Sequence, residues 1–194
     1  PNTMHYEHIK QSLKAGLHTI VEKPFVSTEK QAQEIIKLSN KKRKKLMCAQ
    51  HARFRGDSIK AKEVISQGKL GKIYFIRAQS LQTNYANVNK GSYVNSSLSG
   101  GGPLQDLGAH LVDLACWLSG FERTESVSGN TFNNLIKQTN QSKKNTKKTV
   151  DVEDLFVGKV KFKNNCILSI ETSFILNAPQ DMMKLELYGD KGSL

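Results

Sequence analysis

The chain has 194 residues, of which 38% are hydrophobic and 14 are glycine, so it suits one domain or two small ones and is too apolar for wholesale disorder. Its 29 lysines and arginines against 17 aspartates and glutamates give a net charge of +12, which raises the prior for a polyanionic partner. No run of 18 apolar residues is present, which argues against a transmembrane helix, and the first residues show no signal pattern.

The first fifty residues alternate between helical and strand patterns. Apolar residues four apart predict a helix that ends at Gly16, and residues 18–21 predict a short strand. Thr28 and Gln31 have the spacing of a capping box and open a second helix, which is followed by an apolar strand over 46–49. This order of elements predicts part of a parallel α/β sheet.

The pattern changes beyond residue 56, where a short helix gives way to strands. Alternating apolar and polar residues predict strands at 155–162, 166–176 and 183–188. Alternation of this kind indicates a sheet with one covered face, and we expect the other face to be apolar enough to pair. A helix over 103–118 interrupts the strands. We therefore divide the chain into residues 1–52 and 53–194.

Two clusters of lysine and arginine account for much of the net charge. Residues 41–45 follow a helical pattern and are interpreted as a solvated helix end, where cations suit the helix dipole. Residues 143–148 lie in a polar stretch typical of an exposed loop. A nucleic-acid binder is the alternative, but the basic residues are not interleaved with aromatic ones, and a helix-turn-helix pattern is lacking.

The three cysteines, Cys48, Cys116 and Cys166, are far apart and odd in number, without a C-x-x-C pair. That spacing argues against a disulfide framework or a zinc ribbon. It fits a protein of the reducing cytoplasm.

Glu22-Lys23-Pro24 follows the first predicted strand directly. The carboxyl end of a parallel strand is where open α/β sheets bind ligands, and a lysine there offers three donors to a hydroxyl or a carboxamide. Taken alone this tripeptide is weak, because a lysine after a strand is usually solvated.

A more specific pattern combines the glycines 100–102 with the start of the predicted helix at Pro103. Three glycines allow a close backbone approach, and proline suits the first helical position. Asp106 and His110 are four apart and able to touch, and Asp113 shares their face. A carboxylate beside an imidazole favours its charged form and makes a general acid–base unit. The alternatives are a helix-start aspartate with an unrelated surface histidine, or half of a metal site for which no third ligand is placed.

The glycine pattern, Gly-Gly-Gly-x-Leu-x-Asp-x-Gly-x-His-x-x-Asp, follows Glu22-Lys23-Pro24 by about 80 residues. Together they resemble the glucose–fructose oxidoreductase and inositol dehydrogenase family, GFO/IDH/MocA. Arg53-Phe54 and the glycine-bounded segments 68–73 and 189–192 fall in the family's order. The resemblance spans essentially the whole chain.

The resemblance implies an oxidoreductase that transfers a hydride between NAD or NADP and a sugar, polyol or related hydroxyl substrate. It implies the C-terminal end of a Rossmann-type parallel sheet, followed by an α+β domain with a large, mostly antiparallel open sheet. Lys23 would bind the reacting hydroxyl, His110 would take its proton, and Asp106 would hold His110 or the substrate. A homo-oligomer through the open sheet is also implied.

The family's other site positions carry over in the same way. The cofactor side would consist of Glu22, Lys23, Pro24, Gln50 and Arg53, with His51 beside it. The substrate side would consist of Asn84, Tyr85, Tyr93, Asp106 and His110.

One departure from the family pattern is the lack of the G-x-G-x-x-G loop that binds the pyrophosphate. We therefore interpret the chain as an internal part of a longer protein and expect it to hold a dinucleotide weakly by itself. The alternative function is a non-catalytic ligand-binding or regulatory member of the same fold, which would have no evident use for the full set of Lys23, Asp106 and His110.

Overall fold

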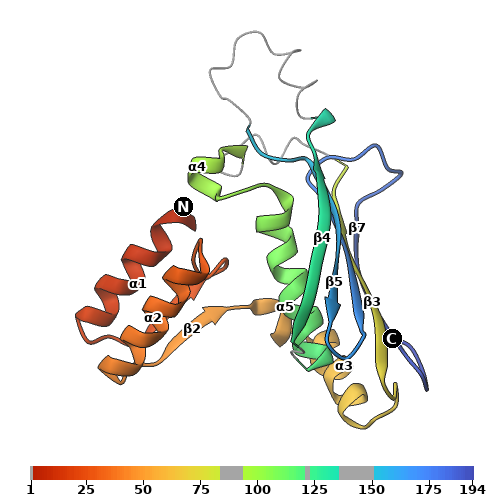
Figure 1. Cartoon of the computed structure of the whole chain (residues 1–194), viewed down its shortest axis with the longest axis horizontal. Helices are drawn as coiled ribbons and strands as arrows, with labels where there is room; N and C mark the ends of the chain where they lie inside the picture. Colours follow the sequence, from red (N-terminus) through yellow and green to blue (C-terminus); the bar gives the residue numbers. More distant parts are fainter. Residues whose placement is uncertain (1, 84–93, 121–122, 136–150) are drawn as a thin grey trace.

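The computed structural model describes residues 2–83, 94–120, 123–135 and 151–194 (Figure 1). The helices are η1 (Asn2–Met4), α1 (His5–Lys14), α2 (Glu29–Lys42), η2 (His51–Phe54), α3 (Gly56–Ser66), α4 (Ser96–Ser99), η5 (Leu104–Gly108) and α5 (Ala109–Ser119). The strands are β1 (Thr19–Glu22), β2 (Leu46–Ala49), β3 (Ile73–Leu81), β4 (Thr124–Phe132), β5 (Leu155–Phe162), β6 (Ile167–Ser173) and β7 (Met182–Gly189). None of the helices in these ranges is both long and apolar enough to cross a membrane.

The first part of the chain is a two-stranded parallel sheet with two helices packed beside it. β1 pairs with β2 in the register Thr19↔Leu46, so both strands end at the same edge. α1 and α2 bury Ile9, Leu13 and Ile35 between them. The predicted capping box is confirmed at its first contact, because the Thr28 side chain accepts a hydrogen bond from the Gln31 amide.

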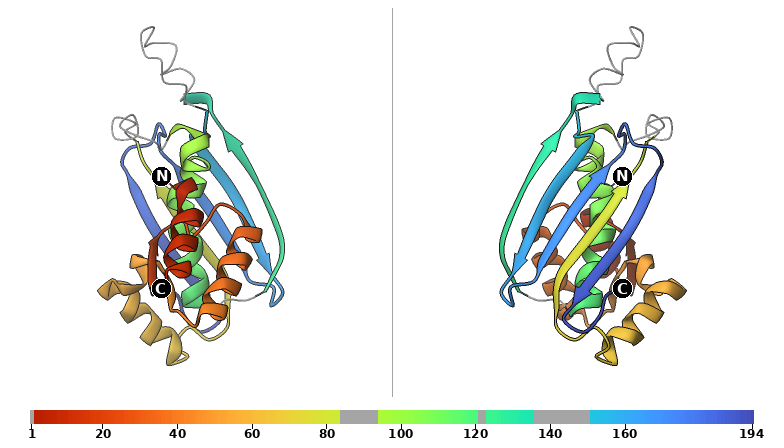
Figure 2. Two further views of the ribbon diagram at one scale, coloured as in Figure 1. Left: turned by 90° about the vertical axis from the view of Figure 1, so that its left-hand side faces the viewer. Right: turned by 90° about the vertical axis from the view of Figure 1, so that its right-hand side faces the viewer.

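The second part is a five-stranded sheet in the order β4-β5-β6-β3-β7. β3 and β6 run parallel, and every other neighbouring pair is antiparallel, which confirms the expected mostly antiparallel sheet. Figure 2 shows the helices gathered on one side of this sheet, with the other side open. The domain boundary at residues 52 and 53 stays a prediction.

The covered face of the sheet forms the main core against α5. Ile76, Leu168 and Leu187 from three adjacent strands are fully buried, as are Leu111 and Ala115 of the helix. Burial of large aliphatic side chains is the chief contribution to such packing, at about 1.5–3 kcal/mol for each.

The open face of the sheet is more polar than the alternation suggested. Strand register places Arg77, Gln79 and Glu171 on it, and the Gln79 amide donates to the Glu171 carboxylate at 3.1 Å. Arg77 also pairs with Glu186 on β7. The open face is therefore mixed: charges hydrogen-bond across its strands, beside the stacked rings of Phe75 and Tyr188.

Two elements differ from the sequence predictions. The predicted helix over 103–118 is a π-helical turn, η5, that leads into α5, and a π turn changes the angular spacing of the side chains that it carries. β4 had no clear signal, since its sequence TESVSGNTF is mostly small and polar and all its residues are exposed. It forms through backbone pairing with β5.

Candidate functional site

The end of β1 is fixed by the first helix of the chain. Lys23 follows β1 directly, and the Lys23–Pro24 peptide bond is cis. His5, at the start of α1, donates from its Nδ1 to the carbonyl oxygen of Pro24 at 2.7 Å. The buried Pro24 turn and the first turn of α1 are thereby held together, and the Lys23 side chain leaves from this edge of the sheet.

Lys23 reaches across to the second part of the chain. Its Nζ donates to the backbone carbonyl oxygen of Asp106 at 3.0 Å and forms an ion pair with the Asp106 carboxylate. The two side chains are 17% and 21% exposed, so water screens this pair less than a surface one. The structure thus brings together two of the three predicted catalytic residues, which are 83 positions apart.

His110 lies on the first turn of α5 and is half-buried. Its Nδ1 is buried and has no hydrogen-bond partner among the described residues. Burial lowers the pKa of His110 below its ordinary value of 6.5, and the neighbouring side chains of Lys23 and His51 lower it further. Asp106 and Asp113 raise the pKa of His110, but their effect is smaller than the combined lowering. His110 is therefore a neutral imidazole at neutral pH, able to accept a proton.

The expected pairing of Asp106 with His110 is not what the structure shows. Among the described residues, the Asp106 carboxylate is bonded to Lys23 and not to the imidazole. Asp106 does raise the pKa of His110, as expected of a neighbouring carboxylate, but burial, followed by Lys23 and His51, outweighs it. The ring beside His110 is that of His51, with centroids 4.7 Å apart in an edge-on arrangement.

A second ion pair joins the two parts of the chain. The guanidinium of Arg53 donates from Nε and Nη2 to the two carboxylate oxygens of Asp113, at 2.7 and 2.5 Å. This bidentate geometry raises the pKa of Arg53 above its ordinary value and fixes η2 against α5. Arg53 was predicted to lie on the cofactor side. In the structure, its guanidinium binds the carboxylate of Asp113.

Two cysteines lie near this ion pair. Burial, followed by the negative charge of Asp113, raises the pKa of both Cys48 and Cys116 above the ordinary value. The two thiols therefore stay protonated at neutral pH and are poor nucleophiles. Groups of three or more residues suited to holding a metal ion do not occur within the described parts of the chain.

Glu153 holds the glycine segment at the start of η5. Its carboxylate accepts hydrogen bonds from the backbone amides of Gly102, at 2.9 Å, and Leu104, at 3.2 Å. These amides are among the unsatisfied donors of a helix start. The lack of a side chain at Gly102 therefore allows Glu153 of the same chain to approach the backbone closely. No local pattern in the sequence points to Glu153, which lies 51 positions from Gly102.

Replacement of Gly102 by alanine should destabilise the protein. A Cβ at this position would lie 2.5 Å from the backbone oxygen of Glu153, so the chain would have to shift. We expect Gly102→Ala to lower the free energy of unfolding by about 1–3 kcal/mol in chemical denaturation. Gly56→Ala is the matched control, because a Cβ there meets nothing within 4 Å. Equal stability of the two variants would contradict the packing described.

The remaining predicted site residues divide into two groups. Glu22 and Gln50 lie at the carboxyl ends of β1 and β2, where Glu22 accepts weakly from the Lys23 amide at 3.3 Å. The Gln50 Oε1 is buried without a partner among the described residues. The predicted substrate-side residues Asn84, Tyr85 and Tyr93 lie outside the residues that the structure describes.

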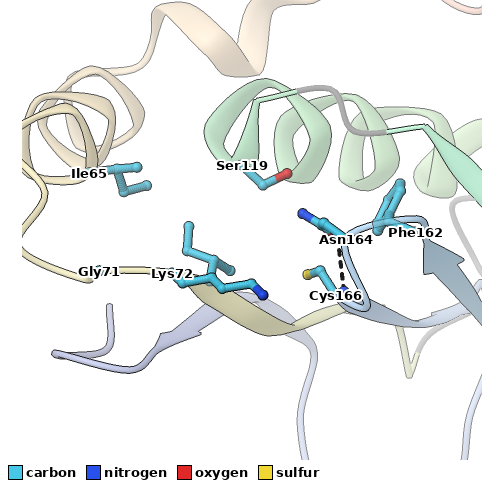
Figure 3. A pocket seen from close by; sticks show the side chains of 8 residues that line it. Ile65, Gly71, Lys72, Ser119, Phe162, Asn164 and Cys166 are labelled. Carbon is cyan, nitrogen blue, oxygen red and sulfur yellow. Dashed lines mark hydrogen bonds between the residues drawn. The ribbon is translucent and has the colours of Figure 1, made fainter.

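A separate pocket of about 230 Å³ lies between the far end of α5 and the sheet (Figure 3). Ser119, Phe162, Asn164 and Cys166 are among its lining residues, and the Asn164 side chain accepts from the Cys166 amide at 2.9 Å. Ser119 lies about 13 Å along α5 from His110 at the usual helical rise. This pocket is therefore distinct from the Lys23–Asp106–His110 cluster.

Comparison with known proteins places this chain in one family. Residues 58–194 match the family model for the GFO/IDH/MocA C-terminal domain. The chain belongs to the GFO/IDH/MocA oxidoreductase family. Residues 1–50 match a second model, described as an oxidoreductase family with an NAD-binding Rossmann fold. The resemblance predicted from the sequence is thereby confirmed, as is the fold class.

Two curated relatives and one solved structure illustrate the likeness. D-glucoside 3-dehydrogenase of Escherichia coli K12 is 37% identical over 98% of this chain and 55% of its own length. Levoglucosan dehydrogenase of Pseudarthrobacter phenanthrenivorans is 26% identical over 100% of this chain and 53% of its own. A structure of levoglucosan dehydrogenase with NADH and levoglucosan has a TM-score of 0.83 and 27% identity, covering 100% and 51%. The chain thus spans about half the length of these GFO/IDH/MocA relatives.

Proposed function

We propose that this chain forms the catalytic part of an oxidoreductase that transfers a hydride between a nicotinamide cofactor and a hydroxyl of a sugar or polyol. The observation that carries the proposal is the cluster of Lys23, Asp106 and His110. It combines a cation, a carboxylate and a neutral, half-buried imidazole from two separate parts of the chain.

The residues take roles that follow from their geometry. His110 accepts the proton of the substrate hydroxyl, because its buried Nδ1 lacks a protein partner and its lowered pKa keeps the ring neutral. Lys23 stabilises the negative charge that develops on the hydroxyl oxygen. Asp106 holds Lys23 in place through its carbonyl and its carboxylate.

The residues at the ends of β1 and β2 fit the nicotinamide end of NAD or NADP. The orphaned Gln50 Oε1 is an acceptor that suits a carboxamide NH₂, and it lies at the edge where parallel sheets bind ligands. Glu22, Lys23 and Pro24 share that edge. The cofactor, when bound, supplies the hydride acceptor or donor, and the protein supplies position and proton transfer.

The substrate class is drawn from the relatives. D-glucoside 3-dehydrogenase and levoglucosan dehydrogenase are named for a glycoside and an anhydrosugar. We propose a secondary ring hydroxyl of a glycoside or anhydrosugar as the reacting group. The lysine would donate a hydrogen bond to the hydroxyl oxygen, and the neutral imidazole would accept one from the hydroxyl proton.

The test is turnover by the full-length protein. Incubation with NAD⁺ or NADP⁺ and a panel of methyl glucosides, levoglucosan and inositols should produce reduced nicotinamide, measured by absorbance. Tight cofactor binding without reduction across the whole panel would contradict an enzyme. It would favour the alternative of a non-catalytic, ligand-binding member of the fold.

We further propose that the full-length protein is a homo-oligomer that associates through the open sheet face. Its support is that this face is uncovered in Figure 2 and carries both charges and the stacked pair Phe75 and Tyr188. Arg77→Glu would place a second negative charge opposite Glu186 and should weaken association. Sedimentation should show an oligomer for the wild type and a smaller species for the variant. A monomeric wild type at all concentrations would contradict this.

A cytoplasmic location is likewise proposed, from the cysteines. Its support is the sequence, in which three cysteines, an odd number, lie far apart without a C-x-x-C pair.

A further inference from the structure

His51 is the aromatic neighbour of the proposed base. It begins η2, directly after the Gln50 position at the end of β2, and its side chain is exposed. Its ring meets that of His110 edge-on, with centroids 4.7 Å apart and planes at 67°. An exposed imidazole in contact with a half-buried one connects the interior of the site to solvent.

The other charged groups near His110 already have partners. Lys23, from the end of β1, and Asp106, from η5, are bonded to one another. Asp113, one turn further along α5, is bonded through both oxygens to Arg53. His51 is therefore the titratable neighbour of His110 that is exposed and not engaged in an ion pair among the described residues.

The position of His51 is fixed by the bidentate ion pair. Arg53 lies two residues further along the same 3₁₀ turn, and it binds Asp113, which lies three residues beyond His110 on α5. The two histidines thus sit on two elements that a pair of strong, directional hydrogen bonds ties together. The ion pair thereby keeps the backbone positions of the two histidines close to one another.

From this geometry we infer that His51 relays the proton between His110 and solvent during turnover. The inference rests on the proposed function. When a substrate hydroxyl is oxidised, its O–H bond breaks and the proton moves to a His110 nitrogen, while the hydride from the neighbouring carbon goes to the nicotinamide. His110 then releases that proton to His51, directly or through one water molecule, and His51 releases it to buffer. In the reduction direction the same proton moves inward.

The first test is chemical rescue in the full-length protein. In dilute buffer, His51→Ala should lower kcat by up to about 10²-fold, the lower range of acid–base contributions. Added imidazole should restore kcat in a saturable manner, while KM for the sugar changes little. His8→Ala, at an exposed position on α1, is the control and should show neither loss nor rescue. A His51→Ala enzyme with wild-type kcat, or with a loss that no buffer relieves, would overturn the relay.

The second test needs no turnover. NMR titration of the His110 side chain should show that His51→Ala raises the pKa of His110, because a neighbouring side chain that lowers this pKa has been removed. His8→Ala should leave the His110 titration unchanged. An unchanged His110 titration in His51→Ala would show that the two imidazoles are not electrostatically coupled, as rings in contact should be, and would overturn the inference. A wild type that oxidises no sugar would instead contradict the proposed function, whatever the titration shows.

Discussion

His110→Ala should lower kcat of the full-length enzyme by about 10²–10⁴-fold, which corresponds to about 3–5 kcal/mol of transition-state stabilisation. The neutral, half-buried imidazole is the proposed base, so its removal would leave the hydroxyl proton without an acceptor. Cofactor affinity should change much less than kcat. Steady-state kinetics with the best glycoside of the panel, together with cofactor titration, measures both quantities.

The pH dependence of kcat/KM gives an independent test of the role of His110. The base must be neutral, so kcat/KM should fall as the pH drops through the pKa of His110 in the free enzyme. Because that pKa lies below 6.5, the acid limb of the wild-type profile should also lie below 6.5. His8→Ala is the control for loss of an exposed histidine and should retain both the rate and the limb. Activity of His110→Ala within about threefold of wild type would contradict the assignment.

Lys23→Met should affect kcat and KM together. Lys23 is the cation that would bind the hydroxyl and stabilise its developing charge, and loss of one such donor costs about 10²–10³-fold in kcat. A rise in KM accompanies it, because ground-state binding is lost as well. The substitution also removes a cation that lowers the pKa of His110, so the acid limb should move to higher pH.

Two variants control for this result. Lys30→Met removes an exposed lysine of α2 and should leave all three quantities unchanged. Asp106→Asn removes a negative charge that raises the pKa of His110, so its acid limb should move to lower pH, opposite to that of Lys23→Met. Limbs that shift in the same direction in both variants would contradict the charge arrangement described. Thermal unfolding of each variant separates these effects from a loss of folded protein.

Much of the site's location could be predicted from the sequence, because local patterns fix it. A short apolar strand followed by Lys23 places the lysine at a sheet edge, and the glycine segment before Pro103 places Asp106 and His110 near a helix start. These rules need only neighbours within one element. Which residue plays each role at the site stays a prediction.

The partners of these residues could not be predicted in the same way. Spacing paired Asp106 with His110, whereas the Asp106 carboxylate binds Lys23, which follows β1 in the two-stranded sheet. Glu153 lies in the segment before β5, and no local pattern connects it with Gly102. The π turn also escaped detection, because helical periodicity assumes an α-helical spacing. Contacts between distant segments depend on tertiary packing that a single sequence does not encode locally.

The parallel pairing of β3 with β6 has a consequence for how the protein folds. Gln79 and Glu171, neighbours on this pair, are 92 positions apart, and the segment between them contains η5, α5, β4 and β5. Contacts of such long range raise the contact order and slow folding, because a large loop must close before they form. During synthesis, β3 and the helix that carries His110 can therefore complete their packing only after β6 has been made. Until β6 is available to pair, the apolar face of β3 stays exposed, where it can bind chaperones or associate wrongly with other chains.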